Sequence, residues 1–308
     1  MNDIILHHYE FSTFSEKVRT ALGLKGLAWR SVEIPGLPPR PLLSPELTGG
    51  YRRAPIMQIG ADIYCDTNII LPTLERLHPV PSLYPNGSEG LARALAFAWE
   101  RQMWIPSISV LTHYIGEHIP PEFLKDRKES YLGIDISKEA MAPRFDQDVQ
   151  AVRAQLAWLR QALSGRRFLF GDAPGAADLA CWQTIYLLRK NCPPEVDALL
   201  GLAPLTGWYD RIVALGHGSP TPMTSEEAFA VARDARPAPV THLDADGDPG
   251  GLRAGCPVRI TPDDNARVPV AGTLVAAGDQ EIVIHRRDAQ AGDLHLHFPR
   301  IGFVVEAV

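Results

Sequence analysis

The stretch from Arg53 to Leu74 (RAPIMQIGADIYCDTNIILPTL) constrains the fold more than any other part of the chain. Two β-prone runs, Ile56 to Ile59 and Ile63 to Cys65, are separated by Gly-Ala-Asp and predict a hairpin. The apolar residues that follow recur at spacings of three and four, which predicts a helix with one buried face. Asp66 and Thr67 stand at the start of that helix. The stretch therefore predicts two paired strands and a helix that begins with an acid and a hydroxyl.

Asp66 and Thr67 allow two interpretations. As helix caps, their side-chain oxygens accept backbone N–H bonds that the first turn cannot satisfy internally. As a binding site, the free N–H groups and the positive end of the helix dipole hold a ligand carboxylate. Taken alone, the pair favours capping, because Asp and Thr are common caps.

The N-terminal residues predict a strand, a helix and a second strand. Asp3 to His8 is strand-prone, and the residues after Tyr9 change to helical spacing, with Gly26 beyond the end of the helix. Trp29 to Ile34 is the second strand. Gly36 to Gly50 is rich in proline, which predicts an irregular loop or a missing helix. The predicted order is strand, helix, strand, long loop, strand, strand, helix.

Three motifs occupy defined places in this order: Ser12-x-x-Ser15-x-Lys17-Val18-Arg19, Ala54-Pro55 before the third strand, and Asp66-Thr67-x-x-Ile70. Together they resemble the glutathione S-transferase family over residues 3 to about 78. The resemblance implies a thioredoxin-like first domain that binds glutathione. It implies that Pro55 is a cis-proline, that the backbone of Ala54 pairs with the cysteinyl part of glutathione, and that Asp66 and Thr67 hold the γ-glutamyl group.

The same resemblance places Ser12 where relatives carry the Ser or Cys that meets the glutathione sulfur. A free thiol has a pKa near ~8.5, and a hydroxyl donor at a helix N-terminus favours the thiolate, which can attack an electrophilic carbon. Ser12 could instead satisfy local backbone groups, and Ser15, Tyr9 and Thr13 are rivals in the same turn. Serine at both positions 12 and 15 leaves no thiol pair, which disfavours disulfide exchange.

Further substrate-binding candidates lie within these motifs, beside them and in the helical region that follows. Arg53, or its neighbour Arg52, could pair with a glutathione carboxylate or be a solvated surface charge. Phe14 lies in the first turn. Trp104 and Tyr114 fall on the helices from which relatives build the pocket for the electrophile, although aromatic residues at helical spacing also form cores.

Residues 88–236 read as an all-helical domain after a Pro-rich linker. The segment from Ala142 to Leu163 is one amphipathic helix. Gly175 and Asp178 resemble the family's capping motif, in which a Ser or Thr and an Asp three residues later cap each other. Glycine offers no side-chain acceptor, so we assign Asp178 to folding rather than to catalysis. Thr224 to Glu227 predicts a further capped helix.

Residues 250–308 change to short strands separated by Gly, Asp and Pro turns, which predicts a small β-barrel-like domain. His295 and His297 alternate onto one strand face, near His285 in the sequence pattern. Because no acidic or thiol partner is fixed nearby in the sequence, we interpret them as a polar sheet face and expect no metal. The acidic run from Asp244 to Gly251 lacks the downstream Glu of a calcium loop. The five predicted strands are Pro257 to Thr261, Val268 to Ala276, Glu281 to His285, Leu294 to Phe298 and Phe303 to Glu306.

Composition excludes several classes of protein. The 308 residues are 45% hydrophobic and 21% charged, with a net charge of -6, and basic residues form no stripe for nucleic acid. No apolar run approaches the ~20 residues of a membrane span, and no secretory signal begins the chain. The four cysteines are scattered without a Cys-x-x-Cys pair, which fits a reducing cytoplasm. Cys65 is the thiol of interest because it adjoins Asp66.

The sequence therefore predicts an α/β thioredoxin-like domain (1–80), an all-α helical bundle domain (88–236) and a small all-β barrel-like domain (250–308). The resemblance implies an enzyme, a homodimer by family habit, that activates glutathione for transfer to a small hydrophobic electrophile. A non-catalytic protein that uses the C-terminal β region to recognise a ligand or partner is the alternative, since a fold does not dictate its function.

Overall fold

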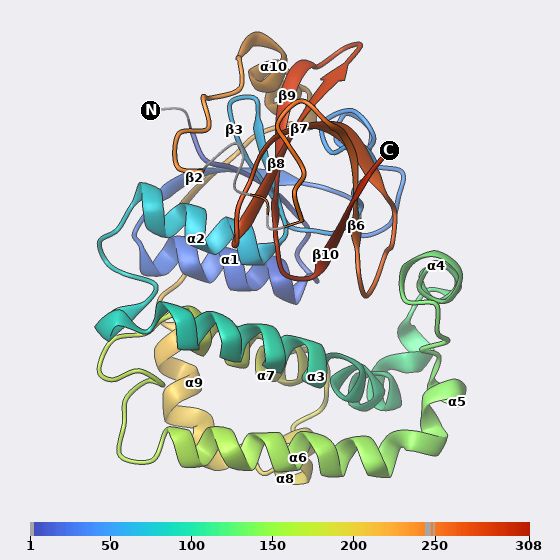
Figure 1. Cartoon of the computed structure of the whole chain (residues 1–308). Helices are drawn as coiled ribbons and strands as arrows, with labels where there is room; N and C mark the ends of the chain where they lie inside the picture. Colours follow the sequence, from blue (N-terminus) through green and yellow to red (C-terminus); the bar gives the residue numbers. More distant parts are fainter. Residues whose placement is uncertain (1–2, 244–247, 249) are drawn as a thin grey trace. The chain divides into compact units, whose positions relative to one another are not determined.

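The computed structural model describes residues 3–243, 248 and 250–308 (Figure 1). Most of the acidic run from Asp244 to Gly251, and with it the rejected calcium loop, lies outside the described residues. The chain divides into two compact units. The sheet unit comprises Met1–Val18, Ala28–Thr73 and Ser219–Val308, and the helical unit comprises Arg19–Leu27 and Leu74–Gly218.

The strands of the sheet unit that the structure describes form one ten-stranded sheet in the order β10-β6-β7-β8-β9-β4-β3-β1-β2-β5. The thioredoxin-like part contributes a mixed group in which β1 pairs with β2 in parallel and with β3 in antiparallel orientation. Apolar, largely buried runs explain why these segments are strands. The strands are β1 (Ile5–His8), β2 (Ala28–Glu33), β3 (Ile56–Ile59), β4 (Asp62–Cys65), β5 (Ser219–Pro222), β6 (Pro257–Pro262), β7 (Val270–Ala277), β8 (Glu281–Asp288), β9 (Gly292–Pro299) and β10 (Phe303–Ala307).

The predicted order of the first 78 residues is confirmed. The first helix, α1 (Thr13–Leu24), ends before Gly26, whose φ of 61° lies in the left-handed region that glycine adopts easily. The second, α2 (Thr67–Leu77), follows the β3–β4 hairpin directly. Between β2 and β3 the described residues form turns and one isolated bridge, Arg40 to Ser44, rather than a helix, as the prolines predict.

All five C-terminal strands are confirmed, but they do not stand apart from the first domain. The strand β9 pairs in parallel with β4, so the red C-terminal strands of Figure 1 continue the sheet of the thioredoxin-like part. Both parts also share one buried core cluster, so burial of their apolar surfaces is mutual. The cluster includes Ile5, Val32, Ile56 and Ile63 from the first part and Val258, Ile284, Leu296 and Phe298 from the second.

The strand β5 was not predicted, because its neighbourhood was assigned to the helical domain. All four residues of Ser219–Pro222 are exposed, and two are prolines, so the segment shows none of the alternation typical of a strand. It is an edge strand, where proline is tolerated, and it pairs with β2. The helix after it, α10 (Ser225–Asp234), has the predicted Thr224–Glu227 capping box and also belongs to the sheet unit.

The helical unit is built around α7, most of whose side chains are buried and which packs against α3 and α9. Within the described residues, no helix combines the length and the apolarity that crossing a membrane would require. The α-helices of this unit are α3 (Glu89–Ile115), α4 (Pro121–Asp126), α5 (Lys138–Met141), α6 (Phe145–Ala162), α7 (Ala176–Asn191), α8 (Glu195–Leu200) and α9 (Thr206–Val213). Short 3-10 or π turns are η1 (Pro85–Gly87), η2 (Gly116–His118), η3 (Arg127–Tyr131), η4 (Ala142–Arg144) and η5 (Ala203–Leu205).

Candidate functional site

Strand register brings three predicted segments to one edge of the sheet. His7, near the end of β1, pairs with Ile56 at the start of β3, and Ile56 also pairs with Cys65 at the end of β4. The turn that holds Ser12 follows β1, the Ala54-Pro55 step precedes β3, and Asp66 follows β4. These three stretches therefore leave the sheet at the same edge.

Ser12 lies at the N-terminus of α1 and is 6% exposed. Its Oγ accepts a hydrogen bond of 3.1 Å from the backbone N–H of Ser15, so it is a cap, as the simpler interpretation required. Because Oγ acts as acceptor in this bond, its hydroxyl hydrogen can be donated elsewhere. Ser15, a rival in the sequence analysis, is fully buried, which makes Ser12 the better placed of the two serines.

Asp66 also caps a helix and does so with an unusual backbone. Its Oδ1 accepts hydrogen bonds from the backbone N–H of Asn68 at 2.9 Å and from the Asn68 side chain at 3.1 Å. Its φ of 95° is rare for a residue with a side chain, and such backbone conformations cluster at functional sites. Its second oxygen, Oδ2, lies 3.9 Å from Nη1 of Arg53.

Lys17 joins the beginnings of the two helices, a role that the sequence analysis did not assign. Its Nζ donates a buried hydrogen bond of 2.7 Å to Oγ1 of Thr67. Since the hydroxyl oxygen of Thr67 accepts from Lys17, its hydrogen is oriented away from that ammonium group. Lys17 belongs to the Ser12-x-x-Ser15-x-Lys17 motif, but nothing in the sequence paired it with Thr67, 50 residues away.

The guanidinium group of Arg53 is hydrogen-bonded to the C-terminal β region and is not a solvated surface charge. Its Nη2 donates to Oδ1 of Asp264 at 2.5 Å and also to the backbone carbonyl of Asn265. Both partners lie between β6 and β7. The bond between Ala54 and Pro55, next along the chain, is cis. The C-terminal region thus reaches the same edge of the sheet as the predicted glutathione-binding segments.

The remaining predicted residues have separate surroundings. The ring of Phe14 lies 5.5 Å from Nζ of Lys17. Trp104 and Tyr114 are both on α3, where ten residues correspond to about 15 Å along the axis, so the helix does not place them side by side. Their predicted place in a pocket for the electrophile stays a prediction. Cys65 is no activated thiol, because burial and then the charge of Asp66 raise its pKa well above the ordinary value.

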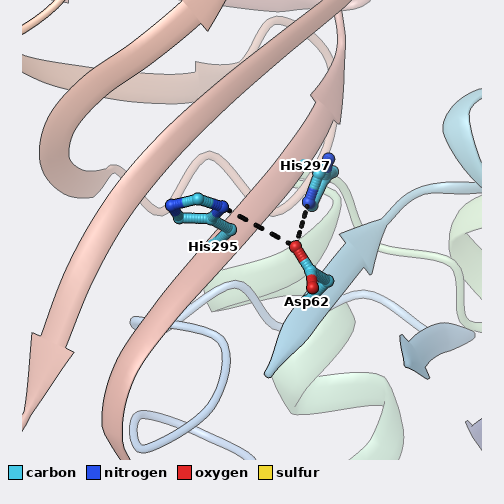
Figure 2. Close-up of side chains that lie close together, drawn as sticks. All are labelled: Asp62, His295 and His297. Carbon is cyan, nitrogen blue, oxygen red and sulfur yellow. Dashed lines mark hydrogen bonds and ion pairs between the residues drawn. The ribbon is translucent and has the colours of Figure 1, made fainter. Parts of the chain in front are cut away.

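A second polar cluster lies at the opposite end of β4; the sequence pattern indicated its two histidines as a polar sheet face but not the carboxylates that they meet. Figure 2 shows His295 and His297, from β9, both directed at the carboxylate of Asp62. The His297 Nε2 lies 3.0 Å from Asp62 Oδ1, and its Nδ1 lies 2.7 Å from Oε1 of Glu281. The signal in the sequence was the His-x-His alternation, but its acidic partner Asp62 is 235 residues from His297.

Electrostatics in this cluster are tightly linked. Burial by itself would lower the pKa of His297, but hydrogen bonds and charges from Asp62 and Glu281 raise it above the usual value. Burial would raise the pKa of Glu281, yet the hydrogen bonds and charges of His297 and His242 lower it. Burial lowers the pKa of His295, and Asp62 offsets this only in part. Asp62, His295 and His297 each offer one ligand atom, and these atoms lie within 4.8 Å of one another.

Comparisons with known proteins agree with this architecture. Residues 6–85 match the family model described as glutathione S-transferase, N-terminal domain, and residues 142–211 match the one described as glutathione S-transferase, C-terminal domain. The crystal structure of a GST-like protein from Pseudomonas syringae is 36% identical, covers 100% of both chains and has a TM-score of 0.79. A glutathione S-transferase of Ceriporiopsis subvermispora, solved in complex with glutathione, is 17% identical with a TM-score of 0.53, covering 70% of this chain and 96% of its own. No curated protein matches the chain.

Proposed function

This chain belongs to the glutathione S-transferase family, and on that premise we propose that it binds glutathione at the shared sheet edge and activates its thiol for transfer to a small hydrophobic electrophile. The observation that carries the proposal is the register of β1, β3 and β4, which places Ser12, Ala54-Pro55 and Asp66-Thr67 at one edge. The relative from Ceriporiopsis subvermispora was solved with glutathione, so this tripeptide is the first ligand to test.

Asp66 and Thr67 would hold the γ-glutamyl end of glutathione. The carboxylate of Asp66 attracts the α-ammonium group, while the N-terminus of α2 and the hydroxyl of Thr67 favour the α-carboxylate. The bond from Lys17 to Thr67 supports this assignment, because it fixes the Thr67 hydroxyl and adds a positive charge near an anionic ligand. The backbone of Ala54 would pair with the cysteinyl residue.

Ser12 would act on the sulfur. Its hydroxyl donates to the thiolate while its oxygen keeps the cap on α1, and the N-terminus of α1 adds a favourable dipole. Both effects lower the pKa of the bound thiol and raise the fraction of nucleophilic thiolate at neutral pH. The thiolate then attacks an electrophilic carbon, for which Phe14, Trp104 and Tyr114 are the proposed lining residues.

We place this activity in a homodimer in a reducing cytoplasm. The family's habit motivates the dimer. All four cysteines are free, and three of them are buried, which supports a compartment where thiols stay reduced.

Titration calorimetry and thermal unfolding with glutathione test the binding step. We expect heat of binding and a higher melting temperature for the wild type. Asp66→Asn should weaken glutathione binding by about tenfold or more, because Asn keeps a capping oxygen for Asn68 but removes the charge opposite the ammonium group. A wild type that gives no heat and no protection would remove the proposal and favour the non-catalytic alternative.

Turnover of a generic aromatic electrophile tests the role of Ser12. Ser12→Ala should lower the rate by roughly ten- to a thousandfold, the range for loss of one donor to a developing anion. Because this change also removes a helix cap, Thr224→Ala is the matched control: it uncaps α10 in the same unit and should leave turnover unchanged. Equal rates for Ser12→Ala and the wild type would exclude Ser12 as the residue that meets the sulfur.

A further inference from the structure

Three potential ligand atoms converge between β4 and β9. Oδ1 of Asp62 lies 3.0 Å from Nε2 of His297 and 3.7 Å from Nδ1 of His295 (Figure 2). Ligands that surround zinc tetrahedrally at ~2.0–2.1 Å are about 3.3–3.4 Å from one another. These two separations bracket that value, and all three atoms lie within 4.8 Å of one another, so a modest rearrangement would let them bind one ion. We propose that Asp62, His295 and His297 form a binding site for a divalent transition-metal ion of the zinc type.

The atoms behind these ligands are arranged as in metal sites. Nδ1 of His297 is hydrogen-bonded to Glu281 at 2.7 Å, which leaves Nε2 directed at Asp62. Oδ2 of Asp62 accepts from the backbone N–H of Ala238 at 2.9 Å, which leaves Oδ1 directed at the histidines. Metal-binding histidines and carboxylates are commonly oriented by such outer hydrogen bonds.

The nitrogen of His295 provides independent support. Its Nδ1 is buried and has no hydrogen-bond partner among the described residues. At 3.7 Å, its separation from Asp62 is too long for a hydrogen bond. A buried polar atom in this condition is costly, and coordination to a cation would satisfy it.

Charge and access also favour a cation. Two buried carboxylates, Asp62 and Glu281, face the same group of histidines, and a divalent ion would offset both. The side chain of His295 keeps 14% of its surface exposed, so the cluster lies close to the protein surface. Imidazole and carboxylate together suit zinc and similar ions better than calcium or magnesium.

The paired strands β4 and β9 hold the proposed metal ligands in place, at the end of β4 away from the proposed glutathione site. Asp62 pairs directly with His295 across the β4–β9 ladder, and strand alternation puts His297 on the same face. Asp62 begins β4, whereas the segment with Asp66 follows its other end. A bound ion would link the C-terminal β region to the thioredoxin-like part without touching the proposed glutathione site.

Zinc binding by tag-free, chelator-treated full-length protein tests the proposal. We expect calorimetry with zinc chloride to give one equivalent per chain and unfolding to shift to higher temperature with zinc but not with magnesium. His295→Ala should weaken zinc binding by at least tenfold, and Glu281→Gln should weaken it by roughly ten- to a hundredfold. His295 is the first choice for substitution because its Nδ1, the proposed ligand atom, has no hydrogen-bond partner among the described residues; the change also removes the interaction of its ring with the backbone of Ala238.

His285→Ala is the matched control. His285 lies directly across from His295 on β8 but is hydrogen-bonded to Asp293, outside the three-ligand group. The His285→Ala protein should therefore bind zinc with the same affinity and stoichiometry as the wild type. The proposal would be overturned if the wild type did not bind one equivalent of zinc, or if the wild type and His295→Ala bound zinc equally. The cluster would then be only a network of hydrogen-bonded charged side chains. Cobalt substitution adds a second measurement: the spectrum should show d–d bands and no thiolate charge-transfer band, and a thiolate band would overturn the assignment.

Discussion

Gly175 shows how space decides which residue fits at a helix start. Its φ of -146° is open to any residue, so backbone freedom is not the reason for glycine. A Cβ added there would lie 2.8 Å from the carbonyl oxygen of Leu83 and 2.8 Å from Cδ of Pro85, closer than such atoms approach. The Ser or Thr of the family's capping motif would therefore not fit at this position, although its side chain would cap the helix better than glycine does.

We expect Gly175→Ser to destabilise the protein by about 1–3 kcal/mol, because overpacking costs more than the added cap returns. Chemical denaturation measures the change. Gly90→Ser is the control, since a Cβ at Gly90 meets nothing within 4 Å, and it should stay within about 0.5 kcal/mol of the wild type. A stabilised Gly175→Ser protein would contradict the packing argument.

His7 carries a pH dependence in a single side chain. Burial lowers its pKa to about 4, with the hydrogen bond to Gln58 offsetting this only in part. The unfolded chain, with a histidine pKa near 6.5, therefore binds more protons than the folded chain between pH 6.5 and 4. Stability from neutral His7 is fully present above pH ~6.5 and is lost as the pH falls toward ~4.

His7→Gln should flatten this dependence, since glutamine does not titrate. The measurement is the free energy of unfolding of both proteins at several pH values between 6.5 and 4.5. The difference between them should change by up to ~1.4 kcal/mol per pH unit, the limit for one proton. Parallel pH curves would show that His7 does not contribute.

Among the elements, α7 depends on one buried carboxylate. Asp178 accepts hydrogen bonds from the backbone N–H groups of Leu169 and Gly175 and from Nε1 of Trp208, at 2.9, 3.1 and 2.9 Å. The predicted cap is confirmed by the bond from the backbone N–H of Gly175, and the contribution of Asp178 to folding stays a prediction. The other two bonds, to a loop and to α9, make it more than a cap.

Asp178→Ala should therefore cost about 3 kcal/mol, above the ~1 kcal/mol expected from the cap motif alone, because three donors lose a buried partner. Thermal and denaturant unfolding measure it, with the single-cap variant Thr224→Ala as the reference at about 1 kcal/mol. Equal losses for the two variants would mean that the Leu169 and Trp208 bonds add nothing.

At the scale of the whole molecule, the C-terminal strands belong to the same compact unit as the strands of the thioredoxin-like part. They share the ladder between β4 and β9 and one buried core, and Arg53 is held by Asp264 and Asn265. Removal of these strands would expose the edge of β4 and much of that apolar core.

We expect a chain that ends at residue 240 to lose cooperative unfolding and resistance to proteolysis in the sheet unit, rather than to behave as an intact two-domain protein. Limited proteolysis with identification of the fragments by mass measures this. Full stability of residues 1–73 in the shortened chain would show that the C-terminal region is a separate domain after all.

Local sequence determined most of the helices and strands and the positions of two residues of the proposed glutathione site. Periodicity and turn residues defined the strands, helices and caps, because these signals act between residues close in the chain. They also placed Asp66 at a helix start and Ser12 in the first turn. The strand β5 gave no such signal, since its only reason for being a strand is its pairing with β2.

Tertiary structure alone decided the contacts between distant segments. The pairing of β9 with β4, the bond from Lys17 to Thr67 and the convergence of Asp62 on two histidines each join residues far apart in the chain. Each of these contacts depends on the register between strands and on which faces of the sheet and helices are buried together. No local pattern in a single sequence specifies strand register or the packing of faces. The strands were predictable one by one, but their order in the sheet was not.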